Sequence, residues 1–173
     1  MPNWCSNQVT IRFKSPEHAD EFVAACPDIL GGKPVPGTLL DVTKPMNLFQ
    51  YYCPEPDPCP DWYTWRTNNW GTKWPPNIGE ILRVSDDVVT IIFDTAWGPA
   101  IEFFEHCALT HGWCWEMLYI ETGMAFAGEC AANKDGILYK DEYNDGDEGY
   151  ATIADSMGVN IEGYDEDDPQ SAP

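Results

Sequence analysis

The fold class follows from one stretch of sequence, Val88-Val89-Thr90-Ile91-Ile92-Phe93-Asp94-Thr95-Ala96-Trp97-Gly98-Pro99. Its first half, Val88 to Phe93, is a nearly continuous apolar run, as found in central strands that are covered on both faces. Gly98 and Pro99 end the run, and a helix pattern from Ala100 to about Thr110 follows. We therefore expect a strand in the middle of a sheet, joined by a turn to a helix that packs on that sheet.

Segments on either side of this stretch predict the remaining elements. Asn7 to Phe13 alternates apolar and polar residues, and Ser15-Pro16 is typical of a helix start. Glu80 to Val84 and Trp113 to Glu121 favour strands. Two shorter strand patterns follow, Met124–Ala127 and Gly136–Tyr139. The resulting order, strand-helix-strand-strand-helix-strand plus extra strands, predicts an α+β, ferredoxin-like fold with two helices on one face of an antiparallel sheet.

Composition divides the chain into a domain and an extension. Residues 1–140 are expected to form the ferredoxin-like domain, with a Pro- and Gly-rich insertion at about 28–79. The insertion also carries apolar residues, so we expect it to be packed and to contain short helical turns. Residues 141–173 are expected to form an acidic C-terminal extension, with a short helix at Tyr150–Met157 and disorder from Tyr164 onward.

The charge of the chain is strongly negative and unevenly distributed. The formal net charge is −20, and the last 33 residues hold 11 acidic and no basic side chains. Binding of phosphate backbones needs Lys and Arg, so direct nucleic-acid binding is disfavoured. A protein partner with a basic surface is compatible with this charge. The alternative, that the charge only keeps the protein soluble, stays open.

The sequence favours a cytoplasmic protein without a metal or another cofactor. It has seven cysteines, no apolar leader, and no run of the ~18 apolar residues that a membrane span needs. Free thiols fit a reducing compartment. His106, Cys107, His111 and Cys114 lie close together, but the C-x2-4-C units common in zinc sites are absent. Cys107 falls on an apolar helix stripe, which favours a core residue.

Two tryptophan motifs stand out, Asn69-Trp70-Gly71-Thr72-Lys73-Trp74 and Phe93 to Pro99. In one interpretation they form a recognition surface, with apolar area from the tryptophans and orientation from Lys73 and Asp94; those tryptophans are Trp70, Trp74 and Trp97. In the other, the first motif packs over the sheet edge against the second, and Lys73 pairs with Asp94 with its stem on a Trp ring. We favour the structural interpretation.

Two further groups are candidates for contact with a partner. Trp113, Trp115, Met117 and Tyr119 alternate along one strand, so Trp115 and Tyr119 could form an aromatic sheet face. Exposed aromatics can stack on single-stranded bases, but the absence of a cationic groove favours a protein partner. The second group is acidic and lies after residue 140: Asp141, Glu142, Asp145, Asp147 and Glu148.

The two motifs, together with the opening Met1–Asn7 and the stretch Gly123–Gly128, resemble the YubB-type ferredoxin-like domain proteins of phages and conjugative plasmids. The resemblance covers Met1 to about Tyr139. It implies a ferredoxin-like fold and a mobile-element origin. It brings no established activity, so no catalytic residue is carried over to this chain.

The sequence therefore predicts a non-catalytic accessory protein of a phage or mobile element. In the host cytoplasm it would bind a host protein with a basic surface, and the concrete form is inhibition of a nucleic-acid-handling defence system by DNA mimicry. One alternative is a metal-dependent hydrolase with a site between the insertion and the sheet. Another is a structural or assembly component of a phage particle. No motif indicates an oligomeric state.

Overall fold

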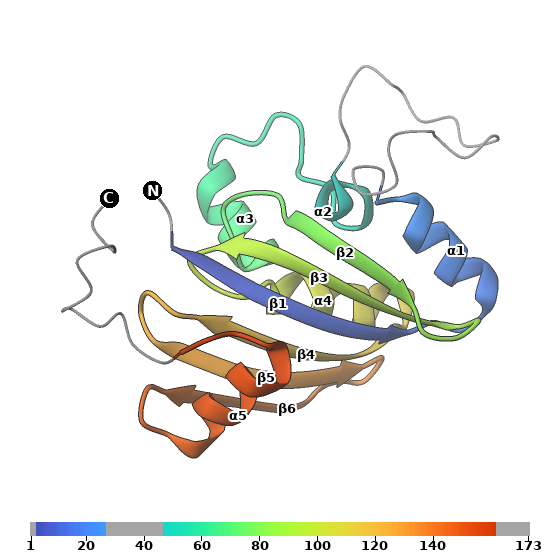
Figure 1. The fold of residues 1–173 in the computed structure, drawn as a ribbon. Helices are drawn as coiled ribbons and strands as arrows, with labels where there is room; N and C mark the ends of the chain where they lie inside the picture. Colours follow the sequence, from blue (N-terminus) through green and yellow to red (C-terminus); the bar gives the residue numbers. More distant parts are fainter. Residues whose placement is uncertain (1–2, 27–46, 162–173) are drawn as a thin grey trace.

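A six-stranded antiparallel sheet organises the protein (Figure 1). The computed structural model describes residues 3–26 and 47–161. The sheet order is β2-β3-β1-β4-β5-β6. The strands are β1 (Trp4–Arg12), β2 (Asn77–Arg83), β3 (Val88–Ala96), β4 (Cys114–Glu121), β5 (Phe126–Asn133) and β6 (Gly136–Asn144). The helices are α1 (Pro16–Ala24), α2 (Leu48–Tyr52), α3 (Trp62–Trp70), α4 (Ile101–His111) and α5 (Glu148–Met157). The predicted α+β class is confirmed.

Strand β3 lies inside the sheet, as its apolar run predicts. It pairs with β2 on one side and β1 on the other. Its side chains Val89, Ile91 and Phe93 are buried on the inner face, which is the face that carries the main core. Ile92 and Asp94 point to the outer face and are only half-buried.

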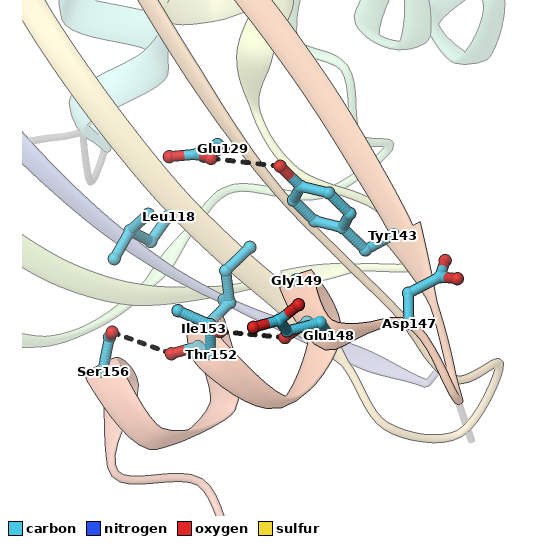
Figure 2. A pocket seen from close by; sticks show the side chains of 9 residues that line it. All are labelled: Leu118, Glu129, Tyr143, Asp147, Glu148, Gly149, Thr152, Ile153 and Ser156. Atoms are coloured by element: carbon cyan, nitrogen blue, oxygen red, sulfur yellow. Dashed lines mark hydrogen bonds between the residues drawn. The ribbon is translucent and has the colours of Figure 1, made fainter.

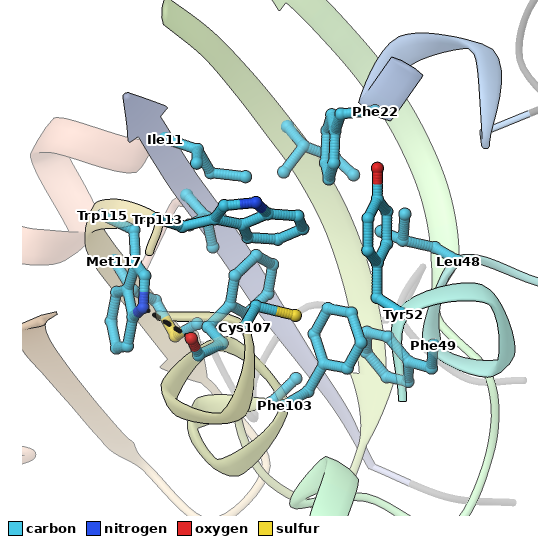
Figure 3. Packing of buried hydrophobic residues seen from close by; sticks show 14 of the residues in the cluster. Ile11, Phe22, Leu48, Phe49, Tyr52, Phe103, Cys107, Trp113, Trp115 and Met117 are labelled. Atoms are coloured by element: carbon cyan, nitrogen blue, oxygen red, sulfur yellow. Dashed lines mark hydrogen bonds between the residues drawn. The ribbon is translucent and has the colours of Figure 1, made fainter. Parts of the chain in front are cut away.

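The main core lies between the inner face and helices α1, α2 and α4, and it is mostly aromatic (Figure 3). Trp113 is at its centre and packs edge-on against Phe13, Phe22 and Tyr52. The buried indole N–H of Trp115 has a hydrogen-bond acceptor, the Phe104 carbonyl, at 2.7 Å. Burial of aromatic side chains is the largest favourable contribution that a core of this kind makes.

The insertion contributes directly to this core. Helix α2 supplies Leu48, Phe49 and Tyr52, all buried. Its N-cap Asn47 accepts a hydrogen bond from the Gln50 amide at 2.9 Å. The described part of the predicted insertion, 47–79, contains α2, α3 and the start of β2, while 28–46 lie outside the described residues.

The C-terminal region differs from the expectation of two helices on one face. Five helices are present among the described residues, and α5 packs on the outer face, in front of β5 and β6 in Figure 1. Its Tyr150, Ile153 and Ala154 cover Ile120 and Ala127 of the sheet. These apolar outward residues on β4 and β5 need a cover, and α5 provides it.

Strand β6 continues to Asn144, so the predicted boundary at residue 140 falls within a strand. The predicted disorder from Tyr164 onward lies outside the described residues. Among the residues described, no helix is both long enough and apolar enough to cross a membrane.

Candidate functional site

Two half-exposed tryptophans lie against one lysine at an end of the sheet, and a third tryptophan packs on one of them. We call Trp4, Lys73, Trp74 and Trp97 the tryptophan cluster. The exposed fractions of the three tryptophans are 46%, 37% and 49%, in that order. The Lys73 ammonium lies 4.2 Å from the Trp74 ring centroid and 5.7 Å from that of Trp97. The Trp4 and Trp74 rings are 6.3 Å apart. The cluster thus combines a large apolar area with a cation held against aromatic faces.

The first motif is fixed by its contacts with the second. Helix α3 ends at the buried Trp70, and Gly71 closes it in the left-handed conformation with φ 77°. A Cβ at Gly71 would lie 2.7 Å from the Pro99 carbonyl and would also overlap the Glu102 carboxylate. The buried Thr72 hydroxyl donates to the Ala96 carbonyl at 3.1 Å. The two motifs therefore pack against each other, as the structural interpretation predicts.

Trp97 is held in a backbone conformation that costs free energy. Its φ is 74°, which is uncommon for a large non-glycine residue. The Trp97 amide donates to the Asn3 carbonyl at 3.0 Å, and the Thr95 hydroxyl donates to the Gly98 carbonyl at 2.7 Å. The Asn7 amide group in turn donates to Thr95 Oγ1 at 2.8 Å. Strain of about 1–3 kcal/mol persists only where neighbouring contacts enforce it, so this turn holds Trp97 in one position.

Asn7 is an unusual residue at the base of this network. It is fully buried on the inner face of β1. Its amide group donates two hydrogens to three acceptors, the Cys5 and Phe93 carbonyls and Thr95 Oγ1, so that one hydrogen is shared between two of them. Its Oδ1 has no hydrogen-bond partner among the described residues. A buried unsatisfied oxygen is costly, and the three donated bonds offset that cost by fixing the turn.

The expected ion pair between Lys73 and Asp94 is not formed. Asp94 lies on the outer face, where its carboxylate accepts a hydrogen bond from the Ser6 hydroxyl at 2.8 Å. Lys73 is directed to the tryptophan rings instead. Asp94 therefore is not part of the tryptophan cluster.

Three predicted interaction residues are in the core. Trp70, Trp115 and Tyr119 are each at most 1% exposed. The alternation of Trp115 and Tyr119 indicates a shared face, but that face is the inner one. They offer no surface to a partner, contrary to the expectation. Trp4, by contrast, belongs to the tryptophan cluster although no pattern predicts its role, because its exposure depends on what lies beside it in the sheet.

The predicted acidic residues lie together on β6 and at the start of α5. Asp141, Glu142, Asp145, Asp147 and Glu148 are all exposed. One carboxylate oxygen of Asp147 already accepts a hydrogen bond, from the backbone N–H of Asn144 at 2.8 Å. The others have no ion-pair partner among the described residues.

A groove of about 840 Å³ runs between α5 and strands β4 to β6 (Figure 2). Leu118 and Ile153 supply apolar lining, and Glu129, Asp147 and Glu148 supply carboxylates. The Tyr143 hydroxyl donates to Glu129 at 3.2 Å. The groove is open and acidic, so its charge is suited to a cationic side chain.

The residues weighed for zinc are spread over different environments. Cys107 is in the core, where burial raises the pKa of its thiol. The His111 ring packs against Tyr52 and Trp113. Cys114 is exposed at the start of β4. In the part of the chain that the structure describes, no group of three or more His, Cys, Asp or Glu residues could hold a metal ion.

Comparisons with known proteins identify one structural relative. No family model matches the sequence, and no curated protein matches it. The chain is similar to the crystal structure of the protein api92 from Yersinia pseudotuberculosis, which is described with the family model DUF1281. The similarity has a TM-score of 0.59 and covers 85% of this chain and 100% of that one, at 8% sequence identity. At this identity the likeness shows a shared α+β fold.

Proposed function

We propose that this protein acts by binding another protein, without catalysis, and that its partner presents a basic surface. The observation that carries the proposal is the tryptophan cluster. Three tryptophans from separate segments are half-exposed side by side, and Trp97 is kept there at a cost in backbone strain. Tryptophan is among the residues most enriched at the energetic centre of protein interfaces.

The rigidity of the cluster supports its role in binding. The Thr72 hydrogen bond joins its two turns, and the Thr95 hydrogen bond closes the second turn. A side chain that is already ordered loses less conformational entropy when a partner binds. The apolar rings would supply binding energy, while the surrounding charge would orient the partner.

The charge of the chain supports a basic partner. Of its nine Lys and Arg residues, Arg12, Arg66, Arg83 and Lys134 form ion pairs with carboxylates. Lys73 is held by tryptophan rings. Lys140 lies among the exposed carboxylates of β6 and α5, which are Asp141, Glu142, Asp145, Asp147 and Glu148. The carboxylates outnumber this lysine, so the region would attract a cationic surface.

The more specific form of the proposal has three parts. The order β2-β3-β1-β4, with α1 and α4 in the connections, supports a ferredoxin-like arrangement. The resemblance of the tryptophan motifs supports a mobile-element origin and action in the host cytoplasm. The net charge of −20 supports mimicry of DNA towards a nucleic-acid-handling host protein.

The experiment is affinity capture from a host lysate with three matched baits. These are the wild type, Trp97→Ala, and Trp62→Ala, which removes an equally exposed tryptophan outside the cluster. We expect a partner that wild type and Trp62→Ala retain, that Trp97→Ala loses, and whose recovery falls as salt rises. Thermal melting of each bait controls for folding. Equal capture by all three baits, or capture indifferent to salt, would contradict the proposal.

A further inference from the structure

We propose that the exposed edge of β6 is a docking strand, to which an extended, basic segment of the partner adds as a seventh strand of the sheet. The inference rests on the proposed function, because it takes the basic partner from there. It adds the place and the mode of binding, which differ from those of the tryptophan cluster.

The backbone of β6 is open for pairing. Within residues 3–26 and 47–161, β6 pairs with β5 alone and is the last strand of the sheet. From Tyr139 to Asn144 it is regular, and the one register shift lies before Tyr139. Six such residues extend about 20 Å at ~3.4 Å each. The Asn144 N–H is not available, because it donates to the Asp147 carboxylate. The rest of such an edge presents a row of unpaired N–H and C=O groups, which is a template for another strand.

Apolar side chains accompany this open backbone. Ile137, Leu138 and Tyr139 are all exposed, and Leu138 is 59% exposed. An incoming strand would cover part of this area. The apolar contact and the backbone hydrogen bonds together are what strand addition uses for affinity.

Carboxylates flank the edge on the outer face. The pairing register puts Glu116 and Tyr139 in one cross-strand row, and Glu129 and Asp141 in the next. Burial raises the pKa of Tyr139, and the neighbouring charges of Glu116, Glu129 and Asp141 raise it further. Lysine or arginine side chains that alternate along a docked strand would meet these carboxylates on the outer face.

The inner face beside β6 is acidic as well. Helix α4 contacts β5 and β6 there. Burial raises the pKa of Cys130 to about 11, and Glu105 and Glu102 raise it while Lys140 lowers it. Glu142 shares this face, because it is opposite Gly128 and two residues from Lys140. The outer face of the edge carries carboxylates, whereas the inner face carries carboxylates together with Lys140, so the outer face is the one that best suits cationic side chains.

The same charges disfavour a second copy of this chain. Two β6 edges in contact would bring Asp141, Glu142 and their flanking carboxylates towards identical groups, and like charges across strands are destabilising. The opposite edge, β2, is less suitable for a docked strand. Its register shifts between Ile78 and Glu80, and Arg83 is paired with Asp20. β6 is thus the edge that fits a basic segment.

The test uses a defined probe, an eight-residue peptide of alternating lysine and valine. A second peptide of equal charge has proline in place of valine, so that it cannot form the ladder. Binding is measured by calorimetry with wild type, Asp141→Lys and Glu80→Lys. The last variant makes the same charge change on the exposed edge strand β2. Amide hydrogen exchange maps the bound site.

We expect the lysine–valine peptide to protect amides of Tyr139–Tyr143 and the proline peptide to bind at least tenfold more weakly. Asp141→Lys should weaken binding about fivefold, and Glu80→Lys by less than twofold. Equal weakening by both variants, equal binding of both peptides, or no binding would overturn the proposal, as would a β6-mediated dimer of the free protein. Protection confined to the tryptophan cluster would also overturn it, yet would leave the proposed function standing.

Discussion

The tryptophan cluster and the β6–α5 region are built in opposite ways. At the tryptophan cluster, apolar side chains are exposed on turns that hydrogen bonds hold tightly. On β6 and α5, charged side chains lie on an open strand and on a helix over a small core of its own. One region is rigid and presents apolar area, and the other is charged and has an unpaired backbone.

This difference suits the two regions to different parts of a binding process. Apolar contacts on a rigid support contribute most to the lifetime of a complex. Exposed charges act over longer distances, so they accelerate association and select the partner. Four sets of variants test this difference, and the first has the largest expected effect.

The first prediction tests whether α5 depends on its small core. Ile153→Ala removes a buried side chain that packs on Ile120 and Ala127. We expect a loss of about 3 kcal/mol in the free energy of unfolding, with faster amide exchange in α5 and unchanged exchange in β3. Ile161→Ala, at an exposed position, is the control. Equal acceleration in β3 would mean that the two regions unfold together.

The second prediction concerns two glycines that both have positive φ, one in each region. Gly71 has φ 77° and close neighbours, whereas Gly146 has φ 92° and nothing near its Cβ position. We expect Gly146→Ala to lose about 1 kcal/mol from conformational strain alone. Gly71→Ala should lose about 2 kcal/mol or more, because contact with the Pro99 carbonyl adds to the strain. Chemical denaturation measures the unfolding free energy of both variants. Equal losses would mean that the backbone around Gly71 shifts to accept the added methyl group.

The third prediction is a pH dependence of stability at Cys130, on the β5 strand next to β6. Its pKa is raised to about 11 in the folded protein, so the unfolded chain ionises first. This stabilisation is complete below about pH 9 and is lost as pH rises towards 11. We expect Cys130→Ala to flatten the decline in unfolding free energy between these values, by at most about 1.4 kcal/mol per pH unit. If the unfolding free energy of Cys130→Ala fell with pH as steeply as that of the wild type, the raised pKa of Cys130 would be contradicted.

The fourth prediction, with the smallest effect, concerns the strain at Trp97. Glycine accepts φ 74° without penalty and alanine does not. Trp97→Gly should therefore be more stable than Trp97→Ala by about 1 kcal/mol. Differential scanning calorimetry would show it as a higher Tm for the glycine variant. A lower Tm would mean that the turn relaxes once the ring is removed.

Sequence patterns predicted much of the scaffold because the signals were local. The apolar run from Val88 to Phe93 does form an interior strand. The Ser15-Pro16 start and the stop at Gly112 do bound two helices. The packing of the two motifs against each other was also predicted, since large apolar side chains in short turns need mutual cover.

The candidate site was less predictable because it depends on contacts between distant segments. Alternation places Trp115 and Tyr119 on one face but does not identify the face that helices cover. The choice of Lys73 between Asp94 and the tryptophan rings depends on side-chain direction across three elements. Trp4 meets Trp74 across a separation of seventy positions, which no local pattern encodes.

By itself, the amino-acid sequence determined the α+β class, the interior position of β3 and the acidity of the chain, because periodicity, turn residues and charge are properties of neighbouring residues. Only packing in three dimensions sets which tryptophans are exposed, that α5 covers the outer face, and that β6 is the last strand of the sheet within the described residues. The physical reason is that exposure is a property of the packed assembly: a side chain is buried or free according to the elements that the fold brings over it.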